Sequence, residues 1–251
     1  MRRRACSLAA TSCTRRRRAS STLTLGDLQL KSDVILAPLE RVSDVGFRRL
    51  CYQHGAALTW TEMVYASDLS RGKAASCDLI DTHDPETLTG VQLLVDRTTA
   101  RDGWGVDCLN AALAALEEGA AGARPEWRHI RALDLNFGCP DPAVSARGAG
   151  PAQLRRRSKM RKLFEALAAW RRVTSLPVGA VGAKIRLGNT LREQQYQVYL
   201  PVAEAAVGCL AAVEEGRAAL SEDRTPVRLT PARLLGPSEG SRLAYAPQSS
   251  A

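Results

Sequence analysis

From about residue 33 the chain alternates short apolar runs with longer amphipathic ones. The apolar runs predict five strands, over residues 33–38, 56–63, 88–95, 131–140 and 178–188. The amphipathic runs predict helices over 43–55, 64–72, 108–120, 159–173 and 193–216, and the polar, proline-containing stretch 76–86 is expected to be a loop. Ser43 or Asp44 can cap the first helix, and Pro201 should kink or break the last one.

Strands that alternate with helices at this spacing indicate βαβ units and a parallel sheet with right-handed crossovers. Active groups in such folds lie at the carboxyl ends of the strands. Candidate site residues therefore gather at these ends, namely Pro38, the segment 61–63, Gln92, the segment 136–139 and the segment 184–186.

The net charge of +9 comes largely from the first 24 residues, which contain seven arginines and no acidic residue. Without those seven, 28 basic side chains face 26 acidic ones, so composition alone does not demand a nucleic-acid partner. Residues 1–26 are expected to be a disordered basic leader. Their composition is that of a mitochondrial or plastid transit peptide, and the alternatives are a basic tail on a cytoplasmic protein or a misassigned start.

Residues 27–216 are expected to form the folded α/β domain, with about five βα units. Beyond about residue 216 no sustained periodicity remains, and residues 217–251 are rich in Pro, Ser, Gly and Arg, which predicts a disordered tail. The seven cysteines form no CxxC pair and the three histidines show no ligand spacing, so we expect no metal site. No apolar run is long enough to predict a membrane-spanning helix.

Cys139 lies in the stretch DLNFGCPDP, between a glycine and a proline at the end of the fourth predicted strand. A lone cysteine is most often a buried packing residue. At a strand end it can instead act as a proton donor, because an ordinary thiol with a pKa of about 8.5 is mostly protonated at neutral pH.

Four other polar residues each allow two interpretations. Lys184 and Arg186 can bind an anionic partner at a strand end or extend to water. Glu62 can be a site carboxylate or a charge that complements a helix dipole. Gln92, inside an apolar strand, can bind a ligand or satisfy neighbouring backbone.

Four motifs together resemble the tRNA-dihydrouridine synthases, flavin enzymes that reduce uridine in tRNA. They occur in the family's order and cover about residues 33–207. They are APLERVSDVGFRRLCYQHGAALTWTEMV at 37–64, VQL at 91–93, NFGCP at 136–140 and KIRLG at 184–188.

The resemblance implies a (β/α)8 TIM barrel that holds FMN at its mouth, with NADPH as reductant and tRNA as substrate. By motif, Cys139 would protonate the uracil, Asn136 and Arg186 would contact the substrate, and Gln92 and Lys184 would bind the flavin ring. The Pro38-Leu39 backbone would line the flavin. The target uracil would have to leave its stack.

The resemblance also implies missing parts. Leu39 and Ser43 replace a usual Met and Thr, Arg155 to Arg157 stand near usual leucines, and the family's later strands and C-terminal helical domain have no counterpart after residue 207. Only five of eight strands are expected, so the barrel would be incomplete, as in a truncated member, and flavin binding weak or absent. The alternatives are a catalytically inactive RNA-binding remnant and a dihydroorotate-dehydrogenase-like flavoprotein.

Overall fold

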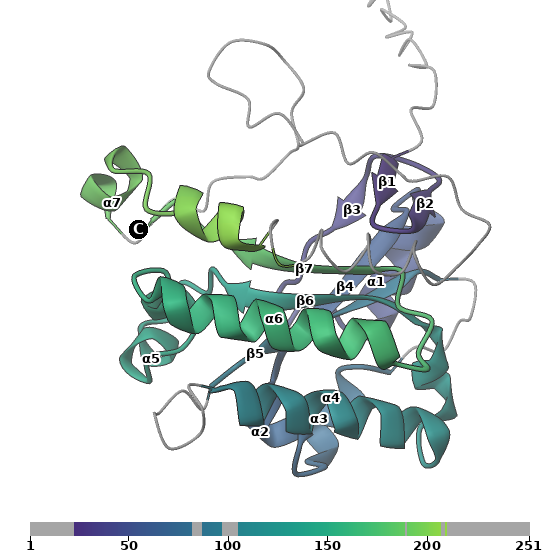
Figure 1. The fold of residues 1–251 in the computed structure, drawn as a ribbon. Coiled ribbons are helices and arrows are strands. Elements are labelled where there is room, and N and C mark those ends of the chain that lie inside the picture. Colours follow the sequence, from purple (N-terminus) through teal and green to yellow (C-terminus); the bar gives the residue numbers. More distant parts are fainter. Residues whose placement is uncertain (1–22, 82–86, 97–104, 189, 207–208, 210–251) are drawn as a thin grey trace, which may run out of the picture.

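The molecule is built on one parallel five-stranded sheet whose strands lie side by side in chain order (Figure 1). The structure, a computed structural model, describes residues 23–81, 87–96, 105–188, 190–206 and 209. The strands are β3 (Ile35–Leu36), β4 (Leu58–Tyr65), β5 (Thr89–Leu94), β6 (Ile130–Phe137) and β7 (Ala180–Ile185). Sequential parallel neighbours joined by helices are the arrangement of a (β/α)8 barrel, so the expected partial TIM barrel with about five βα units is confirmed.

Helices cover the outer face of this sheet. The two long ones, α4 (Val106–Ala121) and α6 (Arg157–Val173), run side by side along it (Figure 1). Their apolar faces meet the outward side chains of β5 and β6 in the main core, for example Leu93, Leu133 and Phe137. The shorter helices are α1 (Val45–Gln53), α2 (Ala66–Leu69), α3 (Ala74–Asp78), α5 (Pro142–Ala146) and α7 (Leu191–Gln195), with 3-10 turns η2 (Pro125–His129) and η3 (Gly150–Gln153).

The opposite face of the sheet corresponds to the inside of the barrel. Its side chains change from apolar to polar along the strands. At the amino end it is apolar: Ala132 and Ala180 pair in register, and Trp60 lies over Gly90. Towards the carboxyl end the inward positions become polar, because β6 contributes Asp134 and Asn136, two residues apart and therefore on one face.

An antiparallel hairpin of β1 (Leu23–Leu25) and β2 (Leu28–Leu30) closes the amino end of the sheet. The backbone N–H of Asp27 donates to Gly179 O at 2.8 Å, and its carboxylate pairs with the buried guanidinium of Arg171 at 3.0 Å. The expected leader over residues 1–26 is therefore wrong at its end, because β1 is already part of the fold. Alternation of leucine and polar residues in LTLGDLQL was the overlooked signal. Residues 1–22 and the expected tail at 217–251 lie outside the described residues.

Most predicted elements are confirmed, with shifted ends. Asp44 caps α1, because its Oδ1 accepts a hydrogen bond from the Phe47 N–H at 2.7 Å. The last predicted helix is broken: α7 ends in a turn at 196–199, and residues 200–206 form a new helical segment with Pro201 in its first turn. The predicted loop 76–86 is wrong at its start, where α3 extends to Asp78; residues 82–86 lie outside the described part.

Two glycines on the inner face of the sheet provide a test of its packing. A Cβ at Gly90 would lie 2.4 Å from the Trp60 ring, whereas one at Gly182 would meet only Asp134 Oδ1, at 4.0 Å. We expect Gly90→Ala to lower the free energy of unfolding by roughly 1–3 kcal/mol. Gly182→Ala, the matched control in the same sheet, should leave it unchanged or raise it by up to about 1 kcal/mol.

Urea unfolding followed by circular dichroism measures both changes. Equal stability of the two variants would show that Trp60 does not pack over β5 in this way.

Candidate active site at the carboxyl ends of the strands

A chain of side-chain hydrogen bonds crosses the polar end of the inner face. Gln92 Nε2 on β5 donates to Asp134 Oδ2 on β6 at 2.7 Å, and Asn136 Nδ2 donates to Gln92 Oε1 at 2.7 Å. All three side chains are buried. Because each amide both donates and accepts, the chain fixes the orientation of both amide groups.

The same chain extends to the predicted proton donor. Asn136 Oδ1 accepts the backbone N–H groups of Gly138 and Cys139, both at 3.0 Å. The side chain of Asn136 therefore holds the turn that follows β6 and places Cys139 at the rim of the sheet. The two residues that the motif pairs in sequence are joined in space by a hydrogen bond.

The Cys139 thiol is buried, with 6% of the residue exposed, in a small cluster with Met63, Leu94, Val144 and Ala149. Burial raises the pKa of this thiol above its ordinary value. At neutral pH the group is therefore a protonated thiol that can release a proton rather than a thiolate nucleophile. Cys139 is thus a buried packing residue that also lies at the strand end, and its proton-donor role stays a prediction.

Asp134 is the site residue that the sequence reasoning missed. Burial raises the pKa of its carboxyl group to about 7, although the hydrogen bond from Gln92 and the charge of Lys184 act in the opposite direction. The sequence contains the information that identifies Asp134, because side chains two residues apart in a strand lie on one face and DLN therefore puts Asp134 beside Asn136.

Lys184 and Arg186 follow the next strand along the sheet. Lys184 pairs in register with Asn136 and is half-buried, and Arg186 lies one residue beyond the end of β7, also half-buried. Lys184 thus lies beside the hydrogen-bond chain rather than extending fully into water.

Pro38 and Leu39 follow β3, and their hydrogen bonds are separate from those that link Gln92, Asp134 and Asn136. The Leu39 N–H donates to Ser43 Oγ at 3.0 Å, and the Leu39 carbonyl accepts from the Ser43 N–H at 2.9 Å. In the described part of the molecule no hydrogen bond links either residue to Gln92, Asp134 or Asn136.

Glu62 does not complement a helix dipole, so that interpretation is wrong, whereas its role as a site carboxylate stays a prediction. It lies within β4, and its Oε2 accepts the backbone N–H of Arg41 at 2.5 Å. Arg41 has a φ of 60°, a left-handed conformation that is unfavourable for this residue type. The carboxylate of Glu62 thereby stabilises the loop that carries Leu39 to α1.

The carboxyl end of the inner face combines polar side chains with open space. A Cβ at Gly182 would meet only Asp134 Oδ1, at 4.0 Å, and the amides of Gln92 and Asn136 lie beside Lys184 on the neighbouring strand. Within the described residues no group of three or more His, Cys, Asp or Glu could hold a metal ion. None of the helices found there is long and apolar enough to span a membrane.

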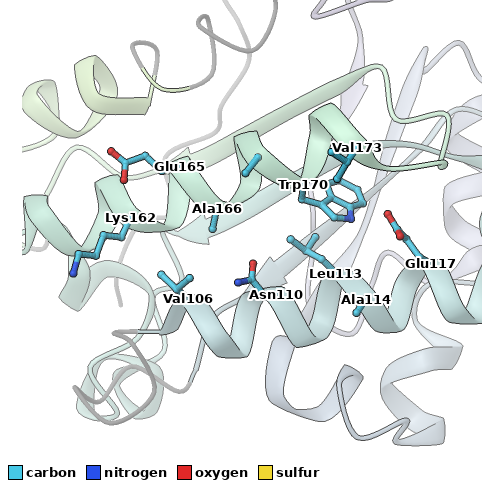
Figure 2. A pocket seen from close by; sticks show the side chains of 11 residues that line it. Val106, Asn110, Leu113, Ala114, Glu117, Lys162, Glu165, Ala166, Trp170 and Val173 are labelled. Atoms are coloured by element: carbon cyan, nitrogen blue, oxygen red, sulfur yellow. The ribbon is translucent and has the colours of Figure 1, made fainter. Parts of the chain in front are cut away.

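A groove on the outer helix layer lies away from this site. It has a volume of about 710 Å³ and runs between α4 and α6 on the outer helix layer, with Leu113 below and Trp170 and Val173 above (Figure 2). Its lining is mostly apolar, and no residue of the predicted site borders it. We therefore assign the candidate site to the strand ends, where the buried Asp134 and Cys139 lie.

Comparison with known proteins identifies the family of this chain. Residues 35–220 match the dihydrouridine synthase (Dus) family. The chain belongs to the dihydrouridine synthase family. All seven predicted site residues lie within the segment that matches this family.

Individual dihydrouridine synthases match a large share of this chain. A Neurospora crassa protein named tRNA-dihydrouridine(47) synthase, with NAD(P)(+) in its name, is 32% identical over 200 residues, which are 73% of this chain and 26% of the relative. A Botryotinia fuckeliana protein of the same name is 32% identical over 62% of this chain and 21% of its own length. A probable tRNA-dihydrouridine synthase of Rickettsia prowazekii is 31% identical over 66% of this chain and 44% of its length. The chain thus spans less than half of these relatives.

The raised thiol pKa predicts a shifted alkylation profile for this dihydrouridine synthase family member. The rate of Cys139 modification by iodoacetamide should rise at a higher pH in the folded chain than in the chain unfolded in urea, because only the thiolate reacts. Peptide mass spectrometry after short pulses gives the rate in both states. The midpoint of each profile reports the pKa, whereas burial alters only its height. A folded-state midpoint at or below the unfolded-state midpoint would contradict the raised pKa of this thiol.

Asp134 predicts a pH dependence of stability. A carboxyl group whose pKa is raised to about 7 in the folded state, against about 4 when unfolded, binds more protons in the folded protein. The free energy of unfolding should therefore fall as the pH rises from about 4 to 7.

Asp134→Asn should flatten this dependence, since an amide does not titrate. Asp107→Asn, on the exposed side of α4, is the matched control and should keep the wild-type slope. Urea midpoints at pH 5 and pH 8 measure the difference, and equal slopes for wild type and Asp134→Asn would contradict a neutral buried acid.

Proposed function

We propose that the chain supplies the proton-donating part of a tRNA-dihydrouridine synthase active site, with uridine in tRNA as the substrate and dihydrouridine as the product. The observation that carries this proposal is the buried Cys139 thiol, whose backbone N–H is held by Asn136 Oδ1 at the mouth of the sheet. Membership of the family and the names of its relatives support it.

Cys139 has the properties that protonation of a carbon requires. Its neutral thiol keeps the proton at neutral pH, and the fixed turn after β6 presents that proton at one position of the rim. In the proposed reaction Cys139 Sγ–H would donate its proton to C5 of the uracil. FMN held by Gln92 and Lys184, with NADPH as its reductant, would supply the hydride chemistry at C6. One proton and one hydride together convert the C5=C6 double bond to a single bond.

The other residues act by binding and positioning. Gln92 and Lys184 would hold the flavin ring, with the backbone of Pro38 and Leu39 along its border. Arg186 would contact the substrate. Asn136 faces the substrate side too, but its oxygen is already engaged by two backbone N–H groups, so its first role is to position Cys139.

The proposed partner is tRNA, from which the target uridine must be unstacked to reach the mouth of the sheet. The basic leader supports a proposal of mitochondrial or plastid targeting, and a cytoplasmic location is the alternative. The leader lies outside the described residues.

A catalytically inactive RNA-binding remnant is the second candidate. The argument for RNA binding was the set of basic residues in and near α6, and the surroundings of these residues weaken it. Arg171 and Lys159 are buried, and Arg155 forms an ion pair with Glu193. These cations serve the fold at least in part, so α6 does not present a uniformly basic face.

The test compares two buried cysteines of similar exposure. The full chain, Cys139→Ala and Cys77→Ala would each be expressed in a bacterial strain that lacks its own dihydrouridine synthases. We expect dihydrouridine in total tRNA from the wild type and from Cys77→Ala, and a loss of at least about 100-fold for Cys139→Ala, within the range of general acid catalysis. Mass spectrometry of digested tRNA measures the product.

Binding of tRNA by filter retention is the companion readout, and it should be equal in all three proteins. A wild-type chain that binds tRNA but forms no dihydrouridine would favour the remnant. Product formation that survives in Cys139→Ala would remove the thiol from the mechanism.

A further inference from the structure

A second, polar pocket lies at the same rim as Cys139. Its volume is about 310 Å³, and it lies where β4 and β5 end and where the loop after α5 begins. Tyr65 connects the pocket with the cluster that contains Cys139, because it borders the pocket and packs against that cluster. The lining residues are Tyr65, Ser67, Asp68, Arg71, Lys73, Asp96 and Arg147.

Both carboxylates in the pocket are already occupied by protein groups. Asp96 accepts the Ser67 N–H at 3.0 Å with one oxygen and binds the Ser67 hydroxyl with the other. Asp68 Oδ1 lies 2.5 Å from the Arg71 guanidinium and 2.8 Å from the Lys73 ammonium. The hydrogen bond and charge of Lys73 lower the pKa of Asp68, so this carboxylate stays ionised and keeps both cations at the pocket.

The remaining groups give an excess of donors. Three cations face two carboxylates. In the part of the chain that the structure describes, the guanidinium of Arg147 makes no hydrogen bond or ion pair, and only its backbone N–H is bonded, to Ser145 O. The Tyr65 hydroxyl is likewise without a hydrogen-bond partner in the part of the chain that the structure describes, and the positive charge of Arg147 acts on it. Guanidinium, ammonium and phenol groups around a small polar pocket are the partners that a phosphate group takes.

We propose that this pocket binds an RNA phosphate beside the target nucleotide, with Arg147 as the principal contact and with Arg71 and Lys73, held by Asp68, as supporting cations. This inference rests on the proposed function, because it places a backbone phosphate of the substrate next to the Cys139 cluster. Phosphate contacts of this kind set the register of a nucleic acid on its enzyme and carry no sequence information.

The experiment measures tRNA binding by the full chain at several salt concentrations. Arg147→Gln should weaken binding roughly tenfold, as for a lost hydrogen bond to a charged group. It should also reduce the slope of log K against log salt by about one. Arg172→Gln is the matched control, because this exposed arginine lies at the last turn of α6, at the opposite end of the sheet. It should keep the wild-type slope.

Binding of inorganic phosphate and of NADPH is measured with the same variants, because a coenzyme phosphate could occupy the pocket in place of an RNA phosphate. Weaker NADPH binding by Arg147→Gln with unchanged tRNA binding would overturn the RNA assignment, and no change with any probe would overturn the phosphate site. A wild-type chain that binds no tRNA would instead contradict the proposed function. Unchanged tRNA binding by Arg147→Gln, with dihydrouridine still formed by the wild type, would leave that function standing and remove this inference alone.

Discussion

The side-chain amide of Asn136 connects the strand scaffold to the chemistry of the rim. Its oxygen accepts two consecutive backbone N–H groups, and its nitrogen binds Gln92, which in turn binds Asp134. Buried amides without partners destabilise a fold, so each member of this chain requires the next one. The position of Cys139 is therefore determined by the sheet and not by the flexibility of a loop.

This arrangement depends on a change from apolar to polar side chains along the inner face of the sheet. At the amino end Trp60 fills the space over Gly90, and the hairpin covers the apolar residues below it. At the carboxyl end Gly182 leaves space, and the neighbouring side chains are polar. The inner face is thus tightly packed and apolar at one end and polar, with free space at Gly182, at the other.

Periodicity predicted the five strands and the long helices well, because burial of one face imposes a repeat that is visible in the residues themselves. It failed where local pairing decides the structure. Leu23–Leu25 forms a strand only because Leu28–Leu30 pairs with it, and Ala74–Asp78 is helical although the following residues are not. The candidate residues at the strand ends followed from topology, whereas Asp134 and Arg147 did not. Their importance comes from burial and from neighbours on other elements, which no single stretch of sequence contains.

The ion pair between Asp27 and Arg171 joins residues 144 positions apart. The hairpin that contains Asp27 packs on Ala57 and Leu58 as well as on Ala180, and it bonds to Gly179. During synthesis from the amino terminus it can meet the first of these residues early, whereas its contacts with Arg171, Gly179 and Ala180 form only after α6 and β7 have been made. The amino end of the sheet is thereby closed by a segment made early through contacts with residues made late.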